Sequence, residues 1–205
     1  MIAALLLAGC ASKPAPPSWR PDAKDALDAF TDDYLRGNTG AANASFARAR
    51  RETTSTGRAD LVAQVELVRC GVLAASLEFD GCPGFAVLAA DATAQQRAYA
   101  AYLAGNWEGL DVAALPEQHR PVMGAGSIAG LADPLAQLVA AGAAFRAGRM
   151  SPADIGVATE TASSQGWRRP LLMWLGVARK RAEAAGDAAA VEQIKRRIAL
   201  ASGQQ

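Results

Sequence analysis

The chain has 205 residues, with 21 basic and 20 acidic side chains and a formal net charge of +1 at pH 7. This balance argues against a nucleic-acid partner, because domains that bind phosphate backbones are usually basic. Only 6% of the residues are aromatic. Alanine, leucine, arginine and glutamine fill long stretches that lack the alternation of β-strands, so the composition predicts an all-α protein.

The chain begins with a short apolar run, residues 2–7, which leads into Leu7-Ala8-Gly9-Cys10. This motif resembles the lipobox at which bacterial lipoprotein signal peptides are cut. The resemblance implies that residues 1–9 are removed and that Cys10 becomes the lipidated amino terminus. No Lys or Arg precedes the run, so we expect the true start to lie upstream. The alternative is an ordinary apolar terminus, since so short a run does not span a bilayer.

Residues 10–20 are predicted to form the lipidated cysteine and a proline-rich tether. In an extended polyproline conformation of about 3 Å per residue, this tether would hold the folded part roughly 30 Å from the lipid. Ala11 and Ser12, rather than aspartate, follow Cys10. By the same resemblance, these residues imply anchoring in the outer membrane, facing the periplasm. Three acyl chains would make this anchoring stable.

Residues 21–205 are predicted to form a helical domain, because apolar residues recur there at spacings of three and four. In chain order, these stripes are Ala23, Leu27, Phe30 and Tyr34; Ala42, Phe46 and Ala49; Leu61, Val65, Val68, Val72 and Ala75; Leu131, Leu135, Leu138, Gly142 and Phe145; and Val191, Ile194, Ile198 and Ala201. Ser151-Pro152 has the capping serine and first-turn proline of a helix start. Gly186-Asp187 predicts the end of one helix and the cap of the next.

One short motif recurs along the chain. Tyr34-Leu35-Arg36-Gly37-Asn38 returns as Tyr102-Leu103-Ala104-Gly105-Asn106, and residues 145–149 form a looser copy. The first two glycines lie 68 residues apart, twice the 34-residue period of tetratricopeptide repeats. Gly37, Ala42, Phe46 and Ala49 resemble the glycine, alanine, aromatic and alanine positions of that repeat. The resemblance implies antiparallel helical hairpins in a tetratricopeptide-like array; generic antiparallel helices that end in glycine are the alternative.

With Cys10 assigned to lipid, Cys70 and Cys82 remain as an even pair. In an oxidising compartment we expect them to form a disulfide, which would contribute about 3 kcal/mol in the chain-entropy model. Two reduced thiols are the alternative. A metal site is not expected, because zinc takes about four nitrogen or sulfur ligands and His119 is far away in sequence. No cofactor is predicted.

Residues 107–130 interrupt the helical pattern with Pro116, Pro121 and several glycines, so this segment is predicted to be a loop-rich connection between two helical halves. It holds the only histidine, His119. Glu117 and Glu108 lie nearby in sequence and could orient an imidazole for acid–base chemistry. A solvated or simply hydrogen-bonded surface histidine is the favoured interpretation.

The sequence does not favour an enzyme. It contains no Gly-x-Ser-x-Gly elbow, no His-Glu-x-x-His helix and no phosphate-binding glycine loop. A peptidoglycan-cleaving enzyme could use a single glutamate as acid and base. The formal candidates are Glu66, Glu78, Glu108, Glu117 and Glu160. None lies in a recognised motif, and no catalytic residue is assigned.

Positive charge gathers in the carboxy-terminal half. Residues from Leu131 onwards carry 10 basic and 6 acidic groups, against 11 and 14 before them. The clusters Arg168-Arg169, Arg179-Lys180-Arg181 and Lys195-Arg196-Arg197 could meet anionic lipid, lipopolysaccharide, peptidoglycan or an acidic protein, although solvated helix faces are the simpler explanation. Trp167 and Trp174 are expected to pack in the core or between hairpins rather than to bind a ligand.

These observations converge on a hypothesis: a lipoprotein of the outer membrane, facing the periplasm, that acts as a protein-binding or assembly module of the cell envelope. Its partners would be envelope proteins, and its contact with the membrane would be the lipid anchor. The alternatives are a peptidoglycan-active enzyme or glycan binder, and a purely structural envelope protein.

Overall fold

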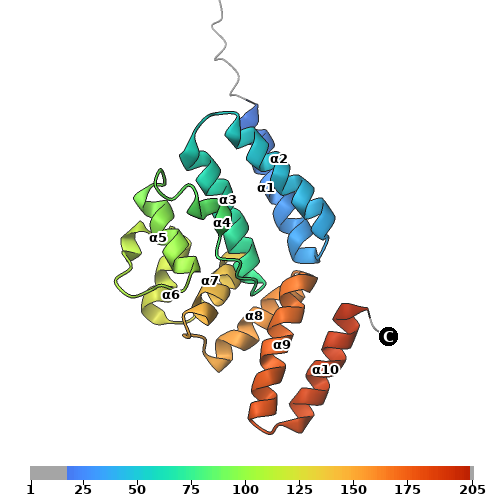
Figure 1. Ribbon diagram of the computed structural model, residues 1–205. Coiled ribbons are helices and arrows are strands. Elements are labelled where there is room, and N and C mark those ends of the chain that lie inside the picture. Colours follow the sequence, from blue (N-terminus) through green and yellow to red (C-terminus); the bar gives the residue numbers. More distant parts are fainter. Residues whose placement is uncertain (1–17, 204–205) are drawn as a thin grey trace, which may run out of the picture.

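The computed structural model describes residues 18–203. This part of the chain contains ten α-helices, two short 3₁₀-helices and no β-strand. The elements are α1 (Trp19–Arg36), α2 (Thr39–Thr54), α3 (Ala59–Ala75), α4 (Pro83–Ala86), α5 (Ala94–Leu103), η1 (Val112–Ala114), η2 (Glu117–His119), α6 (Arg120–Ala125), α7 (Pro134–Arg146), α8 (Pro152–Ser164), α9 (Arg168–Ala184) and α10 (Ala188–Ser202). Adjacent long helices pack as hairpins (Figure 1), which confirms the predicted all-α class.

Helix starts follow the capping signals in the sequence. The Ser151 hydroxyl accepts a hydrogen bond from the Asp154 backbone N–H, and the Asp187 carboxylate accepts one from the Ala190 N–H. Leu131, which the periodicity had joined to the next helix, lies before α7. That helix begins only at Pro134, because the Asp133 carboxylate caps its first turn.

The recurring tyrosine–glycine motif marks equivalent helix ends. Gly37 follows α1, Gly105 follows α5 and Gly148 follows α7, and all three have a positive φ. In the first copy, the Asn38 N–H donates to the Asp33 carbonyl oxygen at 2.8 Å, which closes the helix. The chain turns directly into the next helix after Gly37. After Gly105 it instead enters the segment 107–130, whose only helices are η1, η2 and the six-residue α6.

The core lies where α3 crosses α7. Most residues of both helices are buried, because apolar side chains occupy most of their positions. At their crossing, Gly142 of α7 meets the backbone of α3 so closely that a Cβ there would overlap with the Ala74 carbonyl oxygen. Gly142 therefore belongs to the predicted core stripe as the residue that permits close approach of the two backbones.

The end of the chain returns to its beginning, because α9 packs against both α8 and α1. Trp174 is fully buried, and its indole N–H donates to the Ala75 carbonyl oxygen of α3 at 3.1 Å. This tryptophan is a core residue, as expected. In contrast, α10 packs against α9 and has no buried residue, so it forms the outer edge of the array (Figure 1).

Candidate functional site

A cavity of about 580 Å³ lies between α3, α5 and α7, and residues 114–120 close one of its sides. Figure 1 shows α5 and α6 standing beside α3 and α7 in this part of the molecule. We call it the His119 cavity. Its apolar wall contains Leu67, Val68, Val72, Leu135 and Val139, and its polar side contains Gln64, Gln95, Gln118, Tyr99, His119 and Asp133. A cavity of this size, with an apolar wall and a few polar groups, is typical of a binding site.

His119 is buried, with only 2% of its surface exposed, so the interpretation as a solvated surface residue was wrong. Its ring packs against two tyrosines of α5, with its centroid 5.5 Å from that of Tyr99 and 5.2 Å from that of Tyr102, while the two tyrosine centroids are 6.2 Å apart. These tyrosines are three positions apart and share one helix face, against which η2 folds. Trp107 adds a fourth ring to this aromatic cluster, because it stacks on Tyr102 with the centroids 5.3 Å apart and the ring planes nearly parallel.

Burial makes His119 a neutral residue at neutral pH. Desolvation lowers its pKa from 6.5 to about 4, although the negative charge of Asp133 acts in the opposite direction. Its Nδ1 atom is buried and has no hydrogen-bond partner among the described residues. An unsatisfied buried polar atom is costly, and beside a cavity it can be satisfied by a bound molecule.

The glutamates nearby in sequence do not join this histidine. Glu108 and Glu117 are both exposed, and neither lines the cavity. The carboxylate that does line the cavity, Asp133, caps α7 by accepting a hydrogen bond from the Ala136 N–H. The acid–base arrangement that was the less favoured alternative from the sequence is therefore not assembled, and the environment of His119 suits hydrogen bonding rather than proton transfer.

Amide side chains dominate the polar side of the cavity. Gln96 is held by the fold, because its side chain donates to the Asp60 carbonyl oxygen and accepts from the Thr93 N–H in the capping box of α5. Gln95 and Gln118 are exposed at the cavity. A glutamine amide offers both a donor and an acceptor, so these two residues can pair with the backbone of a bound chain.

The other candidate glutamates are paired with arginines. The carboxylates of Glu66, Glu78 and Glu160 lie 2.8, 3.1 and 2.8 Å from the guanidinium groups of Arg50, Arg169 and Arg197, respectively. Glu66 is buried in this arrangement, and its pair joins α2 to α3. These ion pairs give the three glutamates a structural role.

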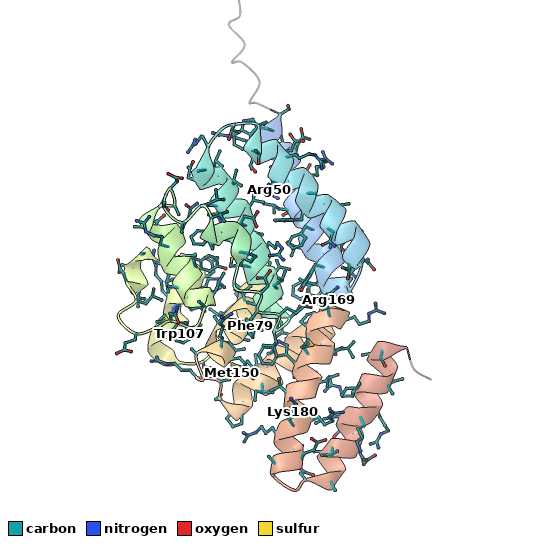
Figure 2. All side chains as sticks on the ribbon, in the orientation of Figure 1. Arg50, Phe79, Trp107, Met150, Arg169 and Lys180 are labelled. Atoms are coloured by element: carbon teal, nitrogen blue, oxygen red, sulfur yellow. A yellow bond between two sulfur atoms is a disulfide. The ribbon has the colours of Figure 1, made fainter. Side chains whose placement is uncertain are left out.

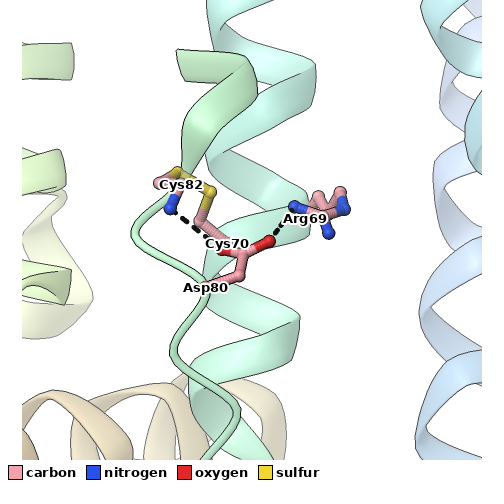
Figure 3. The surroundings of a disulfide bond; sticks show 4 residues. All are labelled: Arg69, Cys70, Asp80 and Cys82. Carbon is pink, nitrogen blue, oxygen red and sulfur yellow. Dashed lines mark hydrogen bonds and ion pairs between the residues drawn. A yellow bond between two sulfur atoms is a disulfide. The ribbon is translucent and has the colours of Figure 1, made fainter. Parts of the chain in front are cut away.

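Cys70 and Cys82 form a disulfide, as predicted, with their Cα atoms 5.7 Å apart. Asp80 supports the bridged loop: its carboxylate accepts from the Cys82 N–H at 2.9 Å and lies 2.8 Å from Arg69 (Figure 3). Burial would raise the pKa of Asp80, but the hydrogen bond from Cys82 and the ion pair with Arg69 outweigh it and lower that pKa. A second cavity of about 310 Å³ lies beside the disulfide.

Cys10 and the rest of residues 1–17 lie outside the described residues. Within residues 18–203, no helix is both long enough and apolar enough to cross a bilayer. The same part of the chain holds no cluster of three or more potential metal-ligating side chains.

Sequence reasoning found His119 but missed Tyr99, Gln118 and Asp133, the residues that surround it. The spacing of Tyr99 and Tyr102 was the available signal, because aromatic residues at positions i and i+3 create a surface on which another ring can pack.

Comparisons with protein-family models, curated proteins and solved structures find no match to this chain. The described residues thus form an all-helical fold with an amide-rich cavity built on α3, α5 and α7.

Proposed function

We propose that this protein is a binding module of the bacterial cell envelope, anchored through lipidated Cys10 in the outer membrane and facing the periplasm. Its partner is an envelope protein, of which one extended segment enters the His119 cavity. The observation that carries this proposal is the cavity itself, about 580 Å³ in volume, whose lining combines apolar side chains with the amide side chains of four glutamines. The lipobox-like motif supports the location.

The chemistry of the lining favours a peptide segment. Gln95 and Gln118 can pair with peptide N–H and C=O groups, while the apolar wall can take side chains that alternate with those groups. His119 is neutral and can exchange a hydrogen bond with the segment without the cost of burying a charge. Recognition of this kind needs no chemical step.

Catalysis receives less support than binding. A glutamate that acts as a general acid needs a raised pKa. Among the described carboxyl groups whose pKa is shifted, all are shifted downwards: Asp60, Asp80, Asp154 and Glu192. Three of the five candidate glutamates are also paired with arginines.

The proposal is tested by placing a photo-crosslinking amino acid at Gln118 or Gln95 in living cells. Gln165 is a matched control, because it is an exposed glutamine at the end of α8 and does not line the cavity. We expect both cavity positions to yield the same discrete adduct with one envelope protein, and Gln165 to yield none. Equal labelling at all three positions, or none at any, would overturn the proposal.

A further inference from the structure

Positive charge is concentrated in the last two helices. Residues 168–202, which we call the basic hairpin, contain eight basic and three acidic side chains, a formal charge of +5. Residues 18–167 contain 12 basic and 17 acidic side chains, a formal charge of −5. The described part of the molecule is therefore strongly dipolar, although the chain as a whole is nearly neutral.

Part of this charge serves the fold. Arg169 and Arg197 pair with Glu78 and Glu160 on the body of the protein. Within the basic hairpin, Arg179 lies 3.5 Å from Glu183 and Lys195 lies 2.7 Å from Glu192. These contacts leave other cations for an external partner.

Four cations of the basic hairpin are exposed and have no ion-pair partner within residues 18–203: Arg168 at the start of α9, and a group of three formed by Lys180, Arg181 and Arg196. Lys180 and Arg181 lie one turn before the end of α9, and Arg196 lies in the middle of the antiparallel α10. With a rise of 1.5 Å per residue, the three lie within about 10 Å of one another along the hairpin axis. Figure 2 labels Lys180 on the outer part of this hairpin.

The basic hairpin lies at the end of the molecule opposite the attachment of the tether. In Figure 1, α1 begins at the top of the view and the turn between α9 and α10 is at the bottom. A protein anchored through Cys10 would thus hold its acidic body nearer the outer membrane and its basic hairpin farther from it. Beyond the hairpin, in the periplasm, lies the cell wall.

We propose that the basic hairpin binds the carboxylate groups of peptidoglycan. This inference rests on the proposed envelope location and adds a second ligand, distinct from the partner in the His119 cavity. Arginine and lysine heads match carboxylates, and a polymer that repeats its carboxylates engages several cations at once. Each exposed pair is weak alone, so binding should depend on the number of cations and on salt. A lipid surface fits less well, because the membrane lies on the tether side.

The test is co-sedimentation of the full chain, kept soluble in detergent, with purified peptidoglycan sacculi. The variant combines Lys180→Glu, Arg181→Glu and Arg196→Glu. The matched control combines Arg20→Glu, Lys24→Glu and Arg51→Glu, an equal charge change on the exposed faces of α1 and α2. We expect the hairpin variant to bind about tenfold more weakly, the control variant to bind like the original, and high salt to release all three.

Equal binding by both variants would overturn the inference, as would no binding of the unmodified chain. Weaker binding of the hairpin variant to anionic phospholipid vesicles, with unchanged binding to sacculi, would overturn it as well. Circular dichroism of each variant verifies that its helices are intact. Crosslinking at Gln118 reports on the cavity separately, so loss of that adduct with retained sacculus binding would remove the proposed partner while leaving this inference in place.

Discussion

Arg169 and Tyr34, 135 positions apart, join the last hairpin to the first. The Arg169 Nε–H donates to the Tyr34 carbonyl oxygen at 2.8 Å, and the guanidinium lies 4.3 Å from the centre of the Tyr34 ring. The same group donates to the Glu78 carboxylate and to the Thr39 hydroxyl. One partly buried side chain (Figure 2) therefore holds three segments of the chain together.

Replacing this residue should destabilise the protein. We expect Arg169→Ala to lower the free energy of unfolding by about 2 kcal/mol, because it removes the charge-assisted hydrogen bonds to Tyr34, Thr39 and Glu78. Arg169→Lys should also lose stability, since an ammonium does not reproduce the planar set of donors. Arg168→Ala, at the exposed neighbouring position, should change stability by less than about 0.5 kcal/mol. Urea unfolding measures the stability of all three variants. If the free energy of unfolding of Arg169→Ala equalled that of the original protein, these contacts would contribute nothing to stability.

Two helical glycines provide a paired test of the core. Gly142→Ala should destabilise the protein by about 2 kcal/mol or more, because its Cβ would overlap with the Ala74 carbonyl oxygen and force α3 and α7 apart. Gly156→Ala, in α8, meets open space and should stabilise the protein by about 0.5–1 kcal/mol through helix propensity. The melting temperature should fall for Gly142→Ala and rise for Gly156→Ala. If both rose or both fell, the close contact between α3 and α7 at Gly142 would be contradicted.

Reduction should weaken the protein through Cys70 and Cys82. Opening the disulfide frees a short loop in the unfolded chain, at a cost of about 3 kcal/mol. The double variant Cys70→Ser/Cys82→Ser should melt at the lower temperature with or without reductant, which serves as the control. The disulfide would be contradicted if reductant did not change the melting temperature of the original chain and if both thiols reacted with an alkylating agent before reduction.

His119 should make stability depend on pH. Its pKa is about 4 in the folded protein and near 6.5 in the unfolded chain, so the unfolded state takes up the proton first as the pH falls. Stability is therefore unaffected by this group above pH 6.5 and falls by about 3 kcal/mol between pH 6.5 and pH 4. His119→Phe, which keeps a ring in the stack, should lack this loss.

The measurement is direct, because the chain contains a single histidine. Its ring protons in an NMR titration report the folded pKa, and urea unfolding at pH 7, 5.5 and 4 reports the loss of stability. A titration midpoint near 6.5 would show that the ring is solvated rather than enclosed by Tyr99 and Tyr102.

The lipid anchor makes a separate prediction. Cys10→Ser should release the protein from membranes and leave its helical circular dichroism unchanged, because no modification or membrane attachment would remain at that position. Fractionation of cell envelopes measures the release, and Cys70→Ser/Cys82→Ser, which retains Cys10, is the control. Continued recovery of the Cys10→Ser variant with the outer membrane would exclude lipidation there as the anchor.

The long helices could be predicted because their signals are local. Spacings of three and four along α1, α2, α3 and α10, and the caps at Ser151 and Asp187, depend on neighbours in sequence. The pairing of Cys70 with Cys82 followed from counting cysteines, and the structure confirms it. The tetratricopeptide-like arrangement stays a prediction.

The cavity could not be predicted in the same way. Its walls come from segments as far apart as Gln64 and Val139, and no local pattern shows that residues 114–120 fold back over α5. Burial of His119 depends on this return of the chain, so its isolated position in a proline- and glycine-containing segment was misleading. The short helices α4 and α6 were missed because they are too short to show an apolar stripe.

The contact of α9 with α1 also determines when the protein can finish folding. In an open helical array each unit touches only its neighbours, so folding can proceed from one end as the chain emerges. Here the first hairpin packs against α3, but its contact with α9 forms only once residues near 170 are available, and that closure spans most of the sequence. Contacts of such long range slow folding and leave apolar surface of α1 open meanwhile. A chain truncated before α9 should therefore be a substrate for chaperones and proteases rather than a smaller version of the same fold.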